Sequence, residues 1–516
     1  MMNTMKKIYN ILAFALAVMA SASCAKDENP KGHLQPGKTE GLVQMTFTAS
    51  MDGLDTKASL GTDLSTSWAV DDSIAVYDGI EARVFKVTSI STETGIATFE
   101  GEAKDTTAYY AVYPYTAFSS VVDSVVTVKI PSSQSLAEGE ILDPAALVST
   151  AFTANPRVPM SFKNVISLAK VTVAEGAVKV KIFANAAAGT TPYIAGTTSV
   201  AITADGIETP VCAGTNTSIA LTMDEGAPFA AGTYYIAVAP STLPAGMYVV
   251  ENTPDAIYKL STDKELRFAR NAGLNLGNIA TNAKTQVVPF TLNSVADYLA
   301  FSENAGLYLE TDVLKIGADL DFQGAEIKTH TARYYGSIDG QKHRIYNYVI
   351  KSGEGTQNTG DAGVFGRIGK GNASYPFYIK DLAFGTKDYN FETGEGTYDG
   401  VSKVTFKSVN DGNNTYYYPG SIAYVYAYAT CENLVNFTPV EITAACTSPH
   451  RAAPLLGTVK SNVTIRNCKN YGDISDATAT CEKNPTVGGI SGALDGDNCI
   501  VEGCVNYGNV TVPGST

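Results

Sequence analysis

The sequence predicts an all-β protein on three observations. Only 17% of its 516 residues are charged, while glycine (46) and tyrosine (29) are abundant, a composition typical of short strands joined by tight turns. Apolar and polar residues alternate from residue 42 onward, which is the period of a strand with one buried face. Residues 462–475 align with residues 498–511, and such an internal repeat predicts stacked β-coils.

The first residues predict a secretory signal. Lys6 and Lys7 precede an apolar run at residues 11–20, which is shorter than the roughly 20 residues that a membrane-spanning helix needs. Small residues then lead to Cys24 in an arrangement that resembles a lipobox, the signal for cleavage beside a lipidated cysteine. Ser21 stands where a lipobox usually has an aliphatic residue, so an ordinary A-x-A cleavage site is the alternative.

The residues behind Cys24 indicate where the protein is sent. Lys26, Asp27 and Glu28 resemble the surface-export signal of Bacteroidota lipoproteins, which directs them to the outer face of the outer membrane. The alternative interpretation is a solvated, charged tether. Residues 29–40 contain Pro and Gly without an apolar period and predict an extended linker. We therefore expect a surface-exposed protein, lipid-anchored in the outer membrane.

Charge and motif content exclude several function classes. The net charge of −14 and the pI near 4.9 argue against nucleic acid as a partner, because phosphate binding needs clustered Lys and Arg. The sequence has four histidines and none of the motifs G-x-S-x-G, H-E-x-x-H or Walker A. We therefore expect a protein without a cofactor or catalytic residues. A carboxylate pair in a groove, as in polysaccharide hydrolases, is the alternative.

Short strands are predicted throughout the first folded part. Alternating and β-branched residues place them at 43–49, 73–77, 84–87, 96–99, 109–113 and 125–130. Their spacing is typical of a β-sandwich. Trp68, the only tryptophan, precedes the second of these strands, and we interpret it as a structural core residue.

Several motifs in one order resemble Bacteroidales fimbrillin-family proteins. These are TKASL at 56–60, Trp68, DSIAVYDG at 72–79, FKNV at 162–165 and YYIAVAP at 234–240. The resemblance covers about residues 40–280. It implies two consecutive β-sandwich domains of transthyretin-like topology, joined near residue 165, and a role connected with fimbriae.

The same resemblance raises the question of polymerisation. Family pilins polymerise after a trypsin-like protease cuts behind an Arg and frees a groove for a donor strand from the next subunit. No Arg occurs before Arg83, so a lipid-held display protein, tip or accessory subunit is favoured. Cleavage at Lys38 or Lys57 keeps a polymerising subunit as the alternative.

The chain changes character after a second linker-like stretch at 280–289. Ser294 is placed to cap a short helix that has Val295, Leu299 and Phe301 available to one face.

The segments that follow this helix, at 314–322 and 335–345, are similar to the entry of bacterial right-handed β-helix domains. Asp319, Asp321 and Asp339 in them raise the question of a catalytic or calcium site. We favour the interpretation that Asp and Gly shape turns between coils here.

The repeat places three pairs of residues at equivalent positions: Cys468 with Cys504, Asn470 with Asn506, and Tyr471 with Tyr507. Asn436 and Phe437 look like a diverged earlier copy of the Asn-Tyr pair. In a stack of coils, aligned asparagines can bond amide to amide and aligned tyrosine rings can stack. The cysteines are then small apolar members of an inward ladder. We expect these residues to form structural ladders in a parallel, right-handed β-helix.

Six of the eight cysteines lie at or after residue 431. In a protein that leaves the cytoplasm, disulfides must be weighed against free thiols. Cys481 with Cys499 is the pair that we weigh, because both lie outside the regular repeat positions. No C-x-x-C occurs, so we expect no zinc site.

Together these features predict a signal peptide (1–23), a flexible tether (24–41), two fimbrillin-like β-sandwiches (42–165 and 166–284) and a β-helix (285–516). We expect a non-catalytic cell-surface lipoprotein adhesin or fimbria-associated subunit that presents a β-helix face to a host protein or glycan, with other fimbrial subunits as further partners. The alternatives are a polymerising pilus subunit and a protein that binds or cleaves polysaccharide through its Tyr-rich segment at 416–418. The last residues follow a coil without a polar cap, so we expect either a longer natural chain or a partner at that end.

Overall fold

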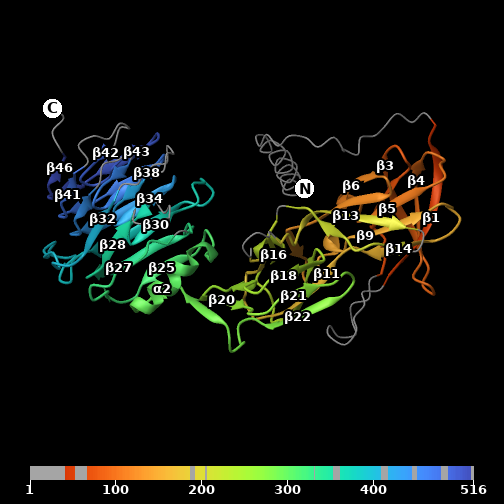
Figure 1. Cartoon of the computed structure of the whole chain (residues 1–516), viewed down its shortest axis with the longest axis horizontal. Coiled ribbons are helices and arrows are strands. Elements are labelled where there is room, and N and C mark those ends of the chain that lie inside the picture. Colours follow the sequence, from red (N-terminus) through yellow and green to blue (C-terminus); the bar gives the residue numbers. More distant parts are fainter. Residues whose placement is uncertain are drawn as a thin grey trace, which may run out of the picture.

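The computed structural model describes residues 41–52, 67–185, 192–203, 206–214, 216–330, 332–352, 361–407, 417–443, 450–477 and 486–512. Strands dominate these residues, and the all-β class is confirmed. Figure 1 shows three parts in a row along the long axis: a barrel, a middle part of packed sheets, and a stack of parallel strands. Strand β1 of the barrel lies at one end of the molecule and strand β46 at the other.

The first part is a closed barrel with the strand order β1-β10-β9-β5-β2-β3-β4. Strand β1 runs antiparallel to β4 and parallel to β10. The strands predicted before residue 131 are confirmed, the last of them as β7 (Val125–Ile130) of the middle part. The barrel strands are β1 (Val43–Met51), β2 (Ser73–Tyr77), β3 (Ala82–Ile90), β4 (Ala97–Ala103), β5 (Tyr109–Tyr113), β9 (Ser149–Thr153) and β10 (Met160–Asn164).

Trp68 lies in the core of the barrel and is 5% exposed. Its indole N–H donates a hydrogen bond to the carbonyl oxygen of Ala49 at 3.1 Å. The rings of Phe99, Tyr113 and Phe162 meet it edge to face, with centroids 4.9 to 5.3 Å away. The structural interpretation of Trp68 is therefore confirmed.

The middle part consists of a six-stranded sheet (β23-β20-β19-β12-β16-β8), a five-stranded sheet (β14-β13-β7-β6 with β15), a three-stranded sheet (β17-β11-β22) and the pair β18-β21. Strands from before residue 165 pair here with strands from after it: β7 with β13, and β8 with β16. The transthyretin-like topology and the boundary near residue 165 stay predictions. The strands are β6 (Phe118–Val122), β7, β8 (Ser133–Leu136), β11 (Ser167–Val173), β12 (Lys179–Phe183), β13 (Gly196–Thr203), β14 (Gly206–Ile207), β15 (Val211–Cys212), β16 (Ser218–Met223), β17 (Gly232–Val238), β18 (Ser241–Leu243), β19 (Tyr248–Asn252), β20 (Ala256–Ser261), β21 (Leu266–Phe268), β22 (Gly273–Asn278) and β23 (Gln286–Pro289).

The predicted linker at 280–289 is wrong in its second half. Residues 286–289 form β23, which pairs antiparallel with β20. The consecutive β-branched residues Val287 and Val288 favour a strand, and Val288 is fully buried.

Helix α2 (Val295–Asn304) follows, and its predicted cap is confirmed: the hydroxyl oxygen of Ser294 accepts a backbone N–H of the first turn at 3.2 Å. The predicted buried face is partly wrong, because Leu299 is 47% exposed while Tyr298 and Phe301 are fully buried. Tyr298 can enter the core because its hydroxyl donates to the carbonyl oxygen of Val364 at 2.6 Å. The apolar stripe therefore runs from Tyr298 to Phe301, three residues apart.

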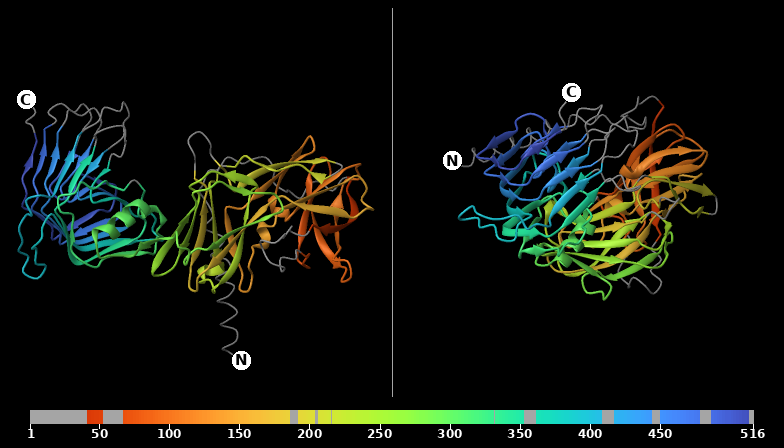
Figure 2. Two further views of the ribbon diagram at one scale, coloured as in Figure 1. Left: turned by 60° about the horizontal axis from the view of Figure 1, so that its bottom comes forward. Right: turned by 60° about the vertical axis from the view of Figure 1, so that its left-hand side comes forward.

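The third part, residues 291–512, is a stack of coils whose strands pair in parallel, and we call it the coil stack. Its first sheet has the order β24-β25-β27-β31-β35-β39-β44, its second β28-β32-β36-β41-β46 and its third β30-β34-β38-β43. Figure 2 shows the strands of successive coils side by side. The strands are β24 (Thr291–Leu292), β25 (Val313–Ile316), β26 (Leu320–Asp321), β27 (Ser337–Tyr346), β28 (Val349–Ser352), β29 (Asp361–Ala362), β30 (Phe365–Ile368), β31 (Phe377–Phe384), β32 (Lys403–Phe406), β33 (Tyr418–Pro419), β34 (Ile422–Val425), β35 (Ala429–Asn436), β36 (Val440–Ile442), β37 (Arg451–Ala452), β38 (Leu456–Lys460), β39 (Val463–Arg466), β40 (Lys469–Asn470), β41 (Ile474–Asp476), β42 (Thr486–Val487), β43 (Leu494–Asp495), β44 (Ile500–Glu502), β45 (Val505–Asn506) and β46 (Val510–Thr511).

One apolar core runs along the coil stack and continues into the middle part. Val250, Ile257 and Val288 of the six-stranded sheet belong to the same buried cluster as Tyr298 and Phe301 of α2. Because the two parts share this core, side chains of the six-stranded sheet can contribute to a site on the coil stack.

Candidate binding face

The predicted lipidation site Cys24 and the predicted export residues Lys26, Asp27 and Glu28 lie outside the described residues. They stay predictions. Within the ranges that the structure describes, no helix combines the length and apolar character needed to cross a bilayer.

Asn436, Asn470 and Asn506 lie one above another on successive coils. The side-chain amide of Asn436 donates to Oδ1 of Asn470 at 2.8 Å, and that of Asn470 donates to Oδ1 of Asn506 at 2.7 Å. The amides of Asn436 and Asn470 also donate to backbone carbonyls two residues further along, at 2.9 and 2.8 Å. The donors of these two buried side chains are thus satisfied inside the stack, so they hold coils together and do not face a ligand.

The ring positions beside this ladder also stack. The centroids of Phe437 and Tyr471 are 4.4 Å apart, and those of Tyr471 and Tyr507 are 4.7 Å apart, with nearly parallel planes. The following Gly472 is required by close approach, because a Cβ there would lie 2.2 Å from the carbonyl oxygen of Thr438.

The cysteines of the repeat are free thiols. Cys431 and Cys468 are fully buried and Cys504 is half-buried. The N–H of Cys468 points at Sγ of Cys504 at 3.4 Å, and Sγ of Cys468 lies 3.6 Å from the carbonyl oxygen of Cys431. Cys499 is also a free thiol, and Cys481, with which we weighed a pairing, lies outside the described residues.

The three aspartates at the entry of the coil stack are occupied by local contacts. Asp321 and Asp339 each accept the backbone N–H two residues later, at 2.8 and 3.1 Å. Asp319 pairs with the guanidinium of Arg344 at 2.6 Å and with Nδ1 of His343 at 3.0 Å. In the described part of the chain, no group of His, Cys, Asp and Glu side chains is arranged to hold a metal ion. Asp321 and Asp339 thus shape turns, as the sequence predicts, whereas Asp319 contacts residues 24 and 25 positions later in the chain.

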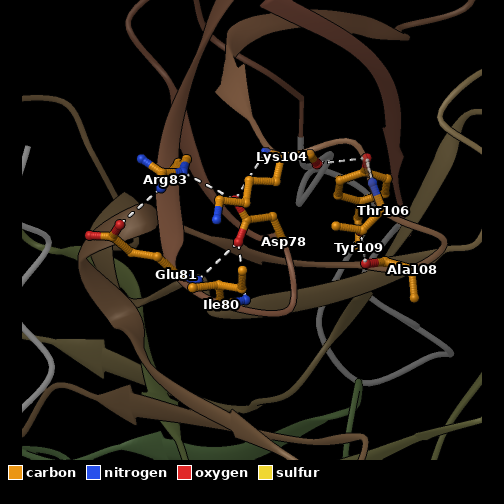
Figure 3. Close-up of polar contacts among 8 residues, drawn as sticks. All are labelled: Asp78, Ile80, Glu81, Arg83, Lys104, Thr106, Ala108 and Tyr109. Carbon is orange, nitrogen blue, oxygen red and sulfur yellow. Dashed lines mark hydrogen bonds and ion pairs between the residues drawn. The ribbon is translucent and has the colours of Figure 1, made fainter. Parts of the chain in front are cut away.

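Asp78 of the DSIAVYDG motif has a structural role in the barrel. Its fully buried carboxylate accepts the backbone N–H groups of Ile80, Glu81 and Lys104 at 2.9 to 3.1 Å, and Nε–H of Arg83 at 3.1 Å (Figure 3). Burial alone would raise the pKa of Asp78, but these donors outweigh it and lower the pKa below its ordinary value. The carboxylate thereby ties the turn after β2 to the end of β4.

A row of tyrosines and cations covers the outer side of the third sheet of the coil stack. Arg367 of β30 pairs in register with Tyr424 of β34, while the adjacent Ile368 and Val425 are fully buried. Because successive side chains of a strand point to opposite sides, Arg367 and Tyr424 face away from the core, although neighbouring side chains leave Tyr424 only 6% exposed. We call this set the tyrosine face; its members are Arg333, Tyr335, Arg367, Lys370, Tyr375, Tyr418, Tyr424, Tyr426, Arg451 and Lys460.

The rings and cations of the tyrosine face contact one another in sequence. The ring centroid of Tyr424 is 4.8 Å from that of Tyr418 and 4.6 Å from that of Tyr426. The guanidinium of Arg333 lies 3.5 Å from the ring centroid of Tyr426, and that of Arg367 lies 5.6 Å from the ring of Tyr424. Each such cation–π contact is worth about 0.5–1 kcal/mol at exposed sites, so together they hold the rings in fixed orientations.

Two cations of the tyrosine face are each matched by one carboxylate. Arg367 pairs with Asp361 at 2.6 Å, and Lys370 pairs with Glu310. Burial raises the pKa of Asp361 even though Arg367 acts in the opposite direction.

Three further cations lie on the tyrosine face. Arg451 and Lys460 share the carboxylate of Asp495, whose pKa burial would raise but which the two cations lower. Arg333 has no ion-pair partner within the ranges that the structure describes. Among the described residues, the tyrosine face therefore gathers five cations in a chain whose net charge is −14.

The sequence located only the edge of this face. Of the predicted Tyr-rich segment, Tyr416 lies outside the described residues, Tyr417 is 3% exposed, and Tyr418 reaches the face. Tyr424 and Tyr426 were missed, although their Y-V-Y spacing was a usable signal, because alternate residues of a strand share one side. Nothing in the sequence marked Arg333 or Arg367.

Comparisons with known proteins find a limited structural similarity to solved structures. Neither a family model nor a curated protein matches the chain. The chain is similar to the crystal structure of a proposed cell adhesion protein from Bacteroides uniformis, with 17% identity and a TM-score of 0.30, covering 48% of this chain and 97% of that one. It is also similar to a fimbrial assembly protein from Parabacteroides distasonis (12% identity, TM-score 0.22, 48% and 94% covered) and to a fimbrial protein from Bacteroides ovatus (13%, 0.21, 41% and 44%).

Proposed function

We propose that this protein is a non-catalytic cell-surface adhesin or fimbria-associated subunit, anchored in the outer membrane by a lipid at Cys24, with the tyrosine face as its binding surface. In this proposal the barrel and the middle part are two transthyretin-like β-sandwiches, and the coil stack is a right-handed β-helix that presents the face to a host protein or glycan. Other fimbrial subunits are further partners.

The observation that carries the proposal is the chain of contacts from Arg333 through Tyr426 to Tyr424. Tyrosine and arginine are, with tryptophan, enriched at binding hot spots, because tyrosine offers a large rigid contact area and arginine offers a planar group with five donors. Here their rotation is restricted further by ring and cation contacts. A face that is ordered before it binds loses less entropy on association.

The protonation state of these tyrosines supports binding more than catalysis. Burial, followed by the neighbouring Tyr424, raises the pKa of Tyr418 to about 12. Burial also raises the pKa of Tyr424 itself. Both hydroxyls therefore stay protonated at neutral pH, where they can donate hydrogen bonds but serve poorly as general bases.

The binding proposal is tested on an array of glycans and host surface proteins. The mature chain is compared with Tyr426→Ala and Arg333→Gln, which remove the most closely packed pair of the face. Tyr507→Ala is the matched control, because Tyr507 is 60% exposed but belongs to the ring ladder. We expect both face variants to lose binding by tenfold or more, about 1.4 kcal/mol, and the control to keep it. Equal binding by all four proteins would contradict the proposal.

The anchor is tested separately in cells. We expect labelled palmitate to enter the wild-type protein and not Cys24→Ser, and added protease to digest the wild-type protein on intact cells. An unacylated mature N-terminus, or protection from protease, would contradict lipid anchoring at the surface.

A further inference from the structure

A cavity of about 260 Å³ lies where the middle part meets the coil stack. Strand β12 of the six-stranded sheet forms one wall, and the segment after α2 forms another. The residues that matter for its chemistry are Lys179, Lys181, Phe183, Glu310, Tyr335 and Lys370. Tyr335 and Lys370 also belong to the tyrosine face, so the cavity opens onto one end of that face.

Lys181 supplies an uncompensated positive charge to this cavity. It lies two residues from Lys179 on β12, and alternate residues of a strand share one side. Lys181 has no ion-pair partner within the described residues; its ammonium lies 4.4 Å from the ring centroid of Phe183 instead. Burial, followed by the neighbouring Lys179, lowers the pKa of Lys181. A half-buried cation without a carboxylate is costly unless an anion joins it.

The carboxylates nearby are already occupied. Glu310 pairs with Lys370, and Asp312 accepts the backbone N–H of Leu309 at 2.6 Å. Lys179 acts on both carboxylates at longer range and favours their ionised forms, although burial raises the pKa of Asp312 to about 6. The positive charge of Lys179 is thus partly compensated by carboxylates. The pKa of Lys181, in contrast, is affected only by burial and by the neighbouring cation of Lys179.

The size and the walls of the cavity restrict its ligand to a small ring with an anionic group. Its volume is near the lower end of ligand sites, which are about 300–1,000 Å³. Tyr335 provides a ring and a hydroxyl at the mouth, next to the ammonium of Lys370, which lies 5.8 Å from the ring centroid. A saccharide unit offers an apolar ring face to an aromatic side chain, and its carboxylate or sulfate can reach the lysines.

We infer that this cavity binds the anionic group of an acidic saccharide, whose neighbouring units lie along the tyrosine face. The inference rests on the proposed binding function of that face and adds the class of ligand. Lys181 is the specificity-determining residue, because an anionic group would compensate its positive charge and a neutral sugar would not.

Three polymers serve as probes in titrations with the mature protein: heparin for sulfate, polygalacturonate for carboxylate, and dextran as the neutral polymer. We expect binding of at least one anionic polymer, with affinity falling as salt is raised, and no binding of dextran. Lys181→Gln should weaken that binding about tenfold or more, while Lys181→Arg should keep it. Lys129→Gln is the matched control, because Lys129 is an exposed lysine on β7.

Polygalacturonate carries carboxylates alone, whereas heparin carries both sulfates and carboxylates, so binding of heparin without binding of polygalacturonate indicates that the cavity requires sulfate. Three results would overturn the inference: no binding of either anionic polymer, equal binding of dextran, or unchanged binding by Lys181→Gln. Tyr426→Ala distinguishes failure of this inference from failure of the proposed function. If Tyr426→Ala loses binding of a neutral glycan or a host protein while Lys181→Gln keeps it, the tyrosine face remains the binding surface although the cavity is not an acidic-saccharide site. Thermal unfolding of each variant shows whether it is folded.

Discussion

The side-chain amide of Asn436 donates a hydrogen bond to the side-chain oxygen of Asn470 across 2.8 Å, and both residues are fully buried. Parallel pairing in register brings the two residues opposite each other on β35 and β40. An amide carries both donors and acceptors, so one residue type can repeat from coil to coil without leaving a buried polar group unpaired. Each interior asparagine thereby depends on the coils on both sides of it.

Replacing Asn470 by Ala should destabilise the coil stack by about 2–4 kcal/mol, because buried polar groups of the neighbouring coils lose their partners. Amide hydrogen exchange of residues 431–476 measures the effect. The control is Asn509→Ala, whose exposed amide donates to Oδ1 of Asp473 at 3.1 Å, and which should change stability by less than about 0.5 kcal/mol. Equal exchange rates in the two variants would show that the interior asparagine ladder does not add to the stability of the coil stack.

Trp68 should report on the barrel separately from the coil stack. It is the only tryptophan, and its buried cluster is distinct from the one that runs through the coil stack. Phe162→Ala removes a ring packed against Trp68 and should lower the stability seen by tryptophan emission by about 3–5 kcal/mol. Asn470→Ala should leave the urea midpoint of that emission in place, and an equal shift in both variants would mean that the two parts unfold as one unit.

The sequence could predict the ladders because the last coils have a regular length. Ladder partners are 36 residues apart between Asn470 and Asn506 and 34 apart between Asn436 and Asn470. The repeat also aligns Asn467 with Gly503, and both have positive φ, 53° and 61°. Asn and Gly are the residues that adopt this conformation most readily, so these corners could have been predicted as well.

The tyrosine face could not be predicted in the same way, because the earlier coils differ in length. Asp381 and Asn433, which are bonded across adjacent coils, are 52 residues apart. Arg333 and Tyr426 meet although they are 93 residues apart in the chain. Such contacts depend on the register of every intervening coil, which irregular coil lengths hide from the sequence.

Cys504 should be more reactive than the buried Cys431 and Cys468. Hydrogen bonds from the thiol and the backbone N–H of Cys468 stabilise its thiolate and lower its pKa, while the pKa of Cys468 is raised. Thiolates are the reacting species, so iodoacetamide at neutral pH should modify Cys504 well before the buried Cys431 and Cys468. Mass spectrometry of peptides over a time course measures the order. Faster labelling of Cys468 would contradict the assignment, and Cys468→Ala should slow the labelling of Cys504 by removing the thiol donor.

The stability of the barrel should depend on acid through Asp78. Its folded pKa lies below its ordinary value of 3.8, so its ionised form stabilises the fold fully above that value, and the contribution is lost as pH falls through the folded pKa. Asp78→Ala leaves Arg83 and three backbone N–H groups without their acceptor, which should cost about 3–5 kcal/mol at neutral pH. The Trp68 emission midpoint in urea, measured from pH 7 down to pH 2, should show the gap between the two proteins narrowing as pH falls. Asp71→Asn, at an exposed position seven residues earlier, should follow the wild-type curve within about 0.5 kcal/mol. A gap between Asp78→Ala and wild type that stays constant with pH would mean that the carboxylate stabilises the barrel by its shape and not by its charge.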